Sequence, residues 1–194
     1  MNKISVLIEG YAKELKNGWK ASSTTTLIQT DNLNILCDPG INYSLLSKKL
    51  KKKNLKPDDI DWIFLSHTHI DHSYNMAHFP QVKVIDLETI YDKDDEYDHG
   101  GKIPSTDLKI IPTPGHALEH CSLVIPTPKG VYVVAADVFW WTGNEDQKTD
   151  KESLLSKDDP FTVDKKDLIQ SRQKVLKLAD YIIPGHGKMF EVEK

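Results

Sequence analysis

Short apolar runs separated by turn residues recur along the chain and predict a fold rich in strands. Runs of this length, bounded by Gly, Pro, Asn or Asp, are typical of buried strands. The runs lie at 6–8, 25–28, 33–37, 62–65, 82–85, 108–111, 121–125, 131–135 and 181–183. Helical spacing of leucines predicts a helix over 43–54, and a second helix over 162–180 with Thr162 as its N-cap. Groups of strands that alternate with helices predict two sheets covered by helices.

Three segments have no regular apolar pattern, and we expect them to be loops. Residues 10–20 are polar apart from Tyr11, Leu15 and Trp19, and a long polar stretch covers 142–162. The segment 86–107 is strongly acidic, so we expect an exposed insertion rather than part of the core. Whether this insertion covers a functional site is left open.

The composition predicts one soluble domain over residues 1–194. A hydrophobic content of 39% and a charged content of 28% are ordinary for a globular protein of this size. The apolar runs are too short to cross a bilayer, so no membrane contact is expected. The N-terminal residues show no signal-peptide pattern, which predicts a cytoplasmic protein. A homodimer is left open.

The cysteines and the net charge exclude few classes of function. Cys37 and Cys121 both lie in apolar runs and are expected to be buried free thiols. The net charge of −4 argues against a general nucleic-acid coat. The lysines between Lys48 and Lys53 predict a solvated helix surface, with a polyanion-binding role as the alternative.

The six residues His67 to His72, with the sequence His-Thr-His-Ile-Asp-His, carry the strongest chemical signal. Four potential metal ligands follow directly after an apolar run, on a predicted strand-to-helix turn. Side chains two apart on extended backbone point the same way, so His67 and His69 can face one metal. Asp71 and His72 begin the helix and can turn toward a second metal.

Three more potential ligands lie at the ends of predicted strands. His116 and His186 each follow a Pro-Gly pair, and Asp137 follows the run 133–136. Strand ends deliver side chains to a shared rim, and the glycines allow close backbone approach. The resulting five histidines and two aspartates suffice for two metal sites of three ligands each plus one bridging carboxylate.

This order of motifs resembles the metallo-β-lactamase superfamily over essentially the whole length. The resemblance implies an α/β (α+β) fold, an αββα sandwich of two mixed β-sheets flanked by helices, with metals at one edge. It implies that the first metal is held by His67, His69 and His116. It implies that the second is held by Asp71, His72 and His186, with Asp137 as the bridge.

The C-terminal third resembles an endoribonuclease-like subfamily, through residues 133–139, 158–160, 171–176, 179–180 and 184–190. That resemblance implies cleavage of RNA phosphodiester bonds as the leading function. The alternative substrates are thioesters, lactones or other small acyl esters, as in glyoxalase II-like members, or β-lactams. A non-enzymatic metal-bound module and an iron oxidoreductase are the remaining alternatives.

The predicted chemistry is hydrolysis with two Zn²⁺ ions, although His and Asp ligands also suit iron or manganese. The nucleophile is expected to be a metal-bound hydroxide, since no serine or cysteine stands in a recognisable nucleophile motif. Asp71 and Asp137 are the predicted catalytic residues. Asp71 is expected to orient the hydroxide or to relay its proton.

Six further residues are predicted to surround the metals. Asp38 ends a strand, and we expect it to accept the second N–H of a ligand histidine. His120 is expected either to contact substrate or to support the site from behind. Trp19 and Trp140, with Tyr11 and Trp141, are placed in loops near the rim, where they stack a base or an acyl group, or pack the loops.

Overall fold

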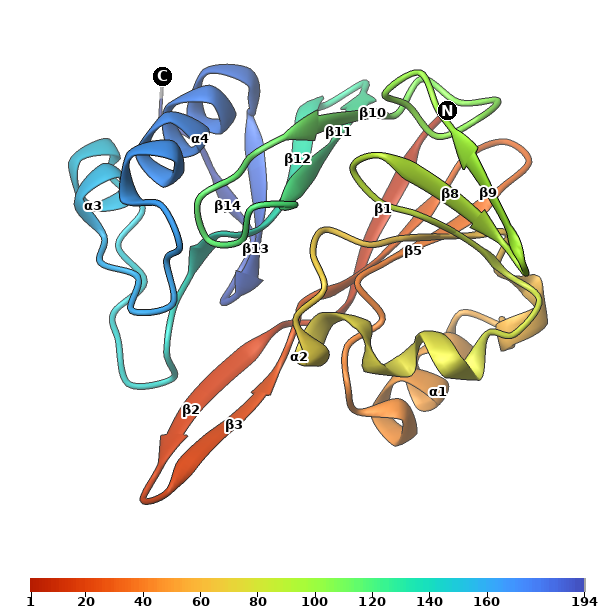
Figure 1. Ribbon diagram of the computed structural model, residues 1–194, viewed down its shortest axis with the longest axis horizontal. Helices are drawn as coiled ribbons and strands as arrows, with labels where there is room; N and C mark the ends of the chain where they lie inside the picture. The colour runs from red at the N-terminus through yellow and green to blue at the C-terminus, as the bar shows by residue number, and fades with distance from the viewer. Residues whose placement is uncertain (194) are drawn as a thin grey trace.

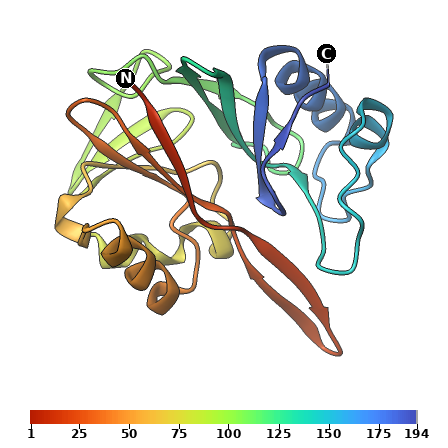
Figure 2. The ribbon, with the colours of Figure 1, turned by 180° about the vertical axis from the view of Figure 1, so that it is seen from behind.

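Two β-sheets pack face to face, and helices cover the outer face of each, in the computed structural model (Figure 1). The structure describes residues 1–193. A view from behind shows the same four layers, with a two-stranded hairpin projecting away from them (Figure 2). The predicted αββα arrangement is confirmed.

The N-terminal sheet has seven strands in the order β1-β4-β5-β6-β7-β8-β9. Their bounds are β1 Lys3–Ile8, β4 Thr25–Gln29, β5 Asn34–Cys37, β6 Trp62–Phe64, β7 Lys83–Ile85, β8 Thr89–Asp92 and β9 Asp95–Asp98. Helices α1 (Tyr43–Lys52) and α2 (Ile70–Ser73) and the 3-10 turns Pro57–Asp59 and Tyr74–His78 connect these strands. Strands β5, β6 and β7 are parallel, and the outer pairs are antiparallel.

The C-terminal sheet has five strands in the order β10-β11-β12-β13-β14. Their bounds are β10 Lys109–Pro112, β11 Cys121–Thr127, β12 Gly130–Trp140, β13 Tyr181–His186 and β14 Phe190–Glu191. Helices α3 (Lys151–Ser156) and α4 (Lys165–Leu178) lie between β12 and β13 in the chain, and β12 and β13 pair in parallel.

Three apolar clusters hold the layers together. The central cluster joins the facing sides of the two sheets, with Phe64 from β6 packed among residues such as Leu123 from β11. A second cluster packs α1 on the outside of the seven-stranded sheet through Leu46 and Leu50. A third packs α4 on the five-stranded sheet through Val175. Burial of these side chains is the main source of stability.

The expected loop at 10–20 is wrong, because this segment forms the projecting hairpin of β2 (Tyr11–Leu15) and β3 (Gly18–Ser22). Leu15 pairs with Gly18 across a two-residue turn at Lys16 and Asn17, a common hairpin length. Most of the hairpin is exposed, so it needs no buried face. Its strands therefore lack the apolar alternation that marks a half-buried strand.

The acidic segment 86–107 is also more regular than expected. It contains β8 and the exposed edge strand β9, and it places Ile90 and Ile103 in the central cluster. The segment is therefore the edge of the seven-stranded sheet, and the expectation of an insertion outside the core is wrong.

Two further expectations around α4 need correction. The stretch 142–162 contains α3, and Asp164 rather than Thr162 caps α4 by accepting the Asp167 N–H. Asp137 does not end its strand, since β12 continues through Trp140.

Both cysteines are free and buried, as predicted. Among residues 1–193 we find no helix that is long and apolar enough to span a membrane.

We predict that Phe64→Ala lowers the free energy of unfolding by about 3–5 kcal/mol, because the fully buried ring leaves a cavity between the sheets. Urea unfolding of the metal-free protein measures this loss. Leu15→Ala on the exposed hairpin is the control and is expected to change the free energy by less than about 0.5 kcal/mol. A loss below about 1 kcal/mol for Phe64→Ala would contradict the described packing.

Candidate metal centre

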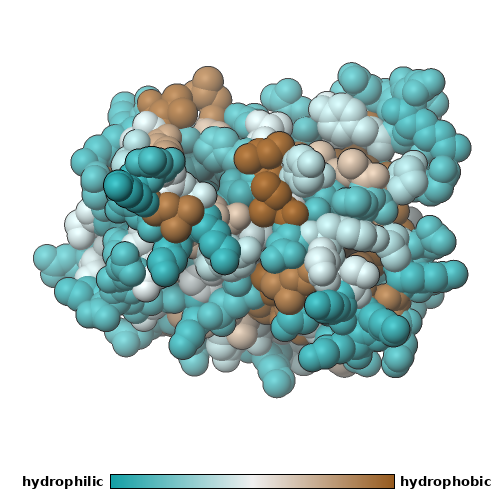
Figure 3. All heavy atoms as spheres, turned by 90° about the horizontal axis from the view of Figure 1, so that it is seen from below, coloured by the Kyte–Doolittle hydropathy of each residue, from teal (hydrophilic) through white to brown (hydrophobic). Residues whose placement is uncertain are grey.

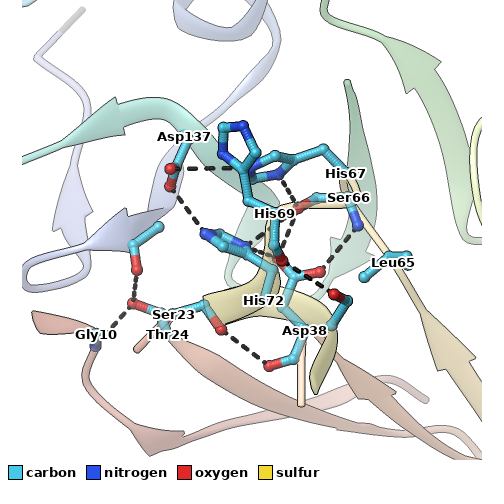
Figure 4. Close-up of polar contacts among 12 residues, drawn as sticks. Gly10, Ser23, Thr24, Asp38, Leu65, Ser66, His67, His69, His72 and Asp137 are labelled. Atoms are coloured by element: carbon cyan, nitrogen blue, oxygen red, sulfur yellow. Dashed lines mark hydrogen bonds and ion pairs between the residues drawn. The ribbon is translucent and has the colours of Figure 1, made fainter. Parts of the chain in front are cut away.

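Seven ligand-type side chains meet where the two sheets join, and they form two adjacent groups. Figure 4 shows several of them converging from the segment after β6, from α2 and from β12. The atoms that could bind metal lie within 4.8 Å of one another in each group. One group is His67, His69, His116 and Asp137, and the other is Asp71, His72 and His186. The structure thus brings together every residue predicted as a ligand.

Asp137 lies between the two groups and turns one oxygen toward each. Its Oδ2 lies 3.2 Å from His116 Nε2 and 3.9 Å from His67 Nε2. Its Oδ1 lies 3.3 Å from His72 Nε2 and 3.7 Å from His186 Nε2. This arrangement is the one that a carboxylate needs to bridge two cations.

The backbone of β12 is irregular where it delivers Asp137. The pairing with β13 shifts register on both sides of Ala136, and Ala136 adopts a φ of 44°. A left-handed alanine is strained, and such strain is concentrated at functional sites. Gly185 of β13 lies against the carboxylate, because a Cβ built there would be 1.7 Å from Asp137 Oδ1. A glycine is therefore required at position 185.

Four of the five histidines are oriented through Nδ1 by an acceptor outside the ligand set. His72 Nδ1 donates to Asp38 Oδ2 at 3.0 Å, and His116 Nδ1 donates to Asp159 Oδ2 at 2.7 Å. The other two donate to Ser66 Oγ (from His67, 3.0 Å) and to the Ser22 carbonyl (from His186, 3.1 Å). Donation through Nδ1 leaves the lone pair of each Nε2 directed at the centre.

Asp38 positions a histidine in each ligand group, His72 directly and His67 through Ser66. The carboxylate accepts the Ser66 N–H at 2.8 Å and the Ser66 hydroxyl at 2.7 Å, besides the His72 ring. Because the Ser66 proton goes to Asp38, the Ser66 oxygen is free to accept from His67. The expected contact of Asp38 with a ligand histidine is confirmed.

The residues present fit divalent cations. His67 Nε2 and His72 Nε2 are fully buried and form no hydrogen bond within residues 1–193. Buried polar atoms of this kind are costly unless a ligand satisfies them, and imidazole and carboxylate suit zinc, iron or manganese.

The pKa values of His67 and Asp137 suit metal ligation. At His72, burial is outweighed by Asp137 and Asp38, which raise the pKa well above its usual range, so a metal would displace a proton from that ring. Burial lowers the pKa of His67 well below its usual range, which keeps that imidazole neutral and able to ligate. Burial would raise the pKa of Asp137, but the neighbouring His72 and His186 outweigh this and hold it well below its usual range. Asp137 is therefore ionised at neutral pH.

A pocket of about 410 Å³ opens over the centre. Its floor contains His69, Asp71, His116, Asp137 and His186, and its walls are Ala12, Trp19, Ala21, Ile41, Ile70, Trp140 and Phe161. No lysine or arginine lines it within the described part of the chain.

Of the four predicted aromatic residues, Trp19 and Trp140 line the pocket, and the other two do not. Trp19 lies on β3 and Trp140 ends β12, so neither is in a loop. Trp141 is buried against Phe190. The expectation that Trp141 flanks the rim is therefore wrong.

His120 supports the site from behind. It is completely buried, its Nδ1 lies 3.0 Å from Thr113 Oγ1, and its ring centroid lies 4.9 Å from that of His67. Burial lowers its pKa to about 3. A ring with no exposed surface does not reach substrate, so the substrate-contact alternative is wrong.

Sequence reasoning missed the roles of Ser66, Asp159 and Phe161, whereas the close backbone approach expected at the Pro-Gly pair is found at Gly185. Ser66 directly precedes His67, and that adjacency was a usable signal. Asp159 lies 43 residues from the histidine that it orients, so no spacing rule identifies it.

We predict that Gly185→Ala weakens binding of the second zinc by at least tenfold, because the new methyl group displaces the Asp137 carboxylate. Zinc titration with a competing chelator measures the two affinities, and circular dichroism verifies the fold. Gly100→Ala is the matched control, since nothing lies within 4 Å of a Cβ built there. Equal zinc affinity in the two variants would contradict the bridging position of Asp137.

We predict that Ser66→Ala weakens zinc binding by about 10–100-fold, because His67 loses its Nδ1 acceptor and Asp38 loses a donor. Zinc affinity is measured for the variant and the wild type by titration against a competing chelator. Ser156→Ala on the exposed surface of α3 controls for loss of a serine hydroxyl. An affinity within twofold of the wild type would show that Ser66 does not position a ligand.

Comparisons with known proteins agree with this site. Residues 18–109 match the family model described as the metallo-beta-lactamase superfamily. The chain is 31% identical to metallo-beta-lactamase domain-containing protein 1 of Xenopus laevis, with 100% of this chain and 83% of that protein covered. It is 31% identical to a "probable metallo-hydrolase" of Methanocaldococcus jannaschii, with 78% of this chain and 68% of that protein covered.

The fold has a solved counterpart in a dizinc quorum-quenching lactonase. The two structures have a TM-score of 0.65 at 19% sequence identity, over 87% of this chain and 74% of the other. That identity is too low to show more than a shared fold. The relatives, the sandwich and the paired His/Asp groups together lead to one conclusion: the chain belongs to the metallo-β-lactamase superfamily.

Proposed function

We propose that the chain is a metal-dependent hydrolase and that its substrate is a small uncharged acyl ester, either an oxygen ester such as a lactone or a thioester. The observation that carries this proposal is the pocket, whose floor is the ligand set and whose walls are mainly apolar. Pockets for small substrates have this composition, with a few polar groups at the reacting end.

Away from the metal ligands, the lining formed by the described residues offers no cationic side chain to an anionic substrate. Apart from the ligand histidines, the ionisable residues of the lining are Asp71 and Asp137, and both are acidic. Sites for nucleic acid generally present lysine and arginine to the phosphates. The lysines between Lys48 and Lys53 do not belong to this lining.

Two cations held by the seven ligands would polarise the scissile carbonyl and lower the pKa of an attacking water. Asp71 lines the pocket and lies 3.3 Å from His186 Nε2 through its Oδ2. Burial raises the pKa of Asp71, but the hydrogen bond and charge of the neighbouring histidines lower it below its usual value overall. The ionised carboxylate is placed to orient the attacking water and to accept its proton.

RNA is the second candidate substrate. Its support is the resemblance of residues 133–139, 158–160, 171–176, 179–180 and 184–190 to endoribonuclease-like members of the superfamily. A phosphodiester could reach the same two metals from solvent, because the floor of the pocket is open. The two candidates differ in one measurable respect, since RNA would need cationic contacts outside the lining.

We predict that zinc-loaded protein hydrolyses at least one member of a panel of lactones, thioesters and p-nitrophenyl esters, with a β-lactam included. Single-stranded RNA in the same buffer is expected to stay intact over many ester turnovers. Spectrophotometry follows the esters, and gel electrophoresis follows a labelled RNA. Cleavage of RNA without any ester hydrolysis would favour the second candidate.

Variants connect the activity to the centre. His67→Ala and Asp137→Ala are expected to reduce hydrolysis to background, because each removes a ligand from the buried set. Asp107→Asn, an exposed carboxylate outside the lining, is the control and should retain full activity. Chelation should abolish turnover and added zinc should restore it. Full turnover by a metal-free preparation would contradict the proposal.

A further inference from the structure

One wall of the pocket is aromatic and comes from three separate parts of the chain. Phe161 lies at its centre, with ring centroids 5.7 Å from Trp19 and 5.8 Å from Trp140. Trp19 belongs to the projecting hairpin, and Trp140 ends the central strand β12. These three residues are called the aromatic wall below.

The pocket mouth exposes apolar surface to solvent. Phe161 is 48% exposed and Trp19 is 43% exposed, while Ile41 and Ile70 on the other wall are 36% and 61% exposed. On the face that carries the hairpin, apolar residues gather among hydrophilic ones (Figure 3). Apolar patches of this kind beside a functional site mark a binding surface for an apolar group.

A single carboxylate connects the aromatic wall to the metal ligands. Asp159 Oδ2 accepts from His116 Nδ1 at 2.7 Å, and Asp159 Oδ1 accepts from the Phe161 backbone N–H at 3.0 Å. Asp159 is itself buried, so both bonds are shielded from water. The position of the Phe161 backbone is therefore fixed relative to the ligand His116.

We propose that the aromatic wall binds the apolar acyl chain of the substrate and that Phe161 determines the preference for chain length. This inference rests on the proposed ester hydrolysis. The reacting carbonyl lies over the floor, and the chain extends between the aromatic wall and Ile70. The absence of cationic side chains in the described lining disfavours an anionic group beside this wall.

The test is a homologous series of p-nitrophenyl esters, from acetate to octanoate, with the zinc-loaded protein of 194 residues. Each methylene group buried against the wall is expected to raise kcat/KM about fourfold, until the pocket is filled. Phe161→Ala is expected to lower the ratio of kcat/KM for octanoate to that for acetate by at least tenfold. Phe161→Leu, which keeps an apolar side chain, should retain most of the ratio.

Two controls separate the wall from the rest of the protein. Tyr97→Ala removes an exposed aromatic ring from β9, outside the lining, and should leave the ratio unchanged. The zinc content of Phe161→Ala should equal that of the wild type, because the backbone N–H that Asp159 accepts is still present. If the wild-type protein hydrolyses the esters but kcat/KM does not change with acyl chain length, the inference is overturned and the proposed hydrolysis still stands.

Binding of products tests the wall without turnover. Alkyl carboxylates from acetate to octanoate are titrated into the zinc-loaded wild type and Phe161→Ala, with calorimetry as the readout. Affinity that rises with chain length in the wild type but not in Phe161→Ala supports the wall even if no ester is cleaved. Equal affinity for alkyl carboxylates of every length overturns the assignment of the aromatic wall. Tighter binding of a free nucleobase than of octanoate overturns it as well.

Discussion

The Asp137 carboxylate is the group on which the centre depends. An ionised carboxylate inside a protein is costly unless opposite charges or donors surround it. Here imidazoles from both ligand groups surround it, and they hold its pKa far below the usual range despite burial. The irregular pairing of β12, the strained Ala136 and the missing side chain at Gly185 all place this one carboxylate. A regular β12 would direct its side chains elsewhere.

The centre also joins the two halves of the sandwich. The seven-stranded sheet contributes Asp38 and the residues after β6, and the five-stranded sheet contributes Asp137 and His186. Each ligand is therefore correctly placed only when the two sheets have packed. Metal binding and folding are coupled under such conditions, since the unfolded chain has no preformed site. The central apolar cluster and the bound metals would both stabilise the packing of one sheet against the other.

Local signals explain which features the sequence predicts. The ligands from His67 to His72 were recognisable because four of them occupy one turn. Two sheets covered by helices followed from apolar runs of strand length, and the αββα sandwich followed from the resemblance to the superfamily. The hairpin β2–β3 was missed because exposed strands need no apolar alternation. Asp159 and Phe161 were missed because their partners are distant in the chain and come together only in the folded protein. Whether an aromatic residue reaches the pocket is a tertiary property, as the difference between the neighbours Trp140 and Trp141 illustrates.

The bond between Asp159 and the residue at position 161 uses the main chain of that residue. Its side chain is therefore free to change without loosening His116, provided that the residue keeps an N–H, which excludes only proline. A protein with the Asp159–Phe161 segment can acquire a new substrate preference by one substitution at position 161 while its metal ligands stay in place. Substitutions at position 161 are thus a direct route to altered specificity, by natural divergence or by engineering.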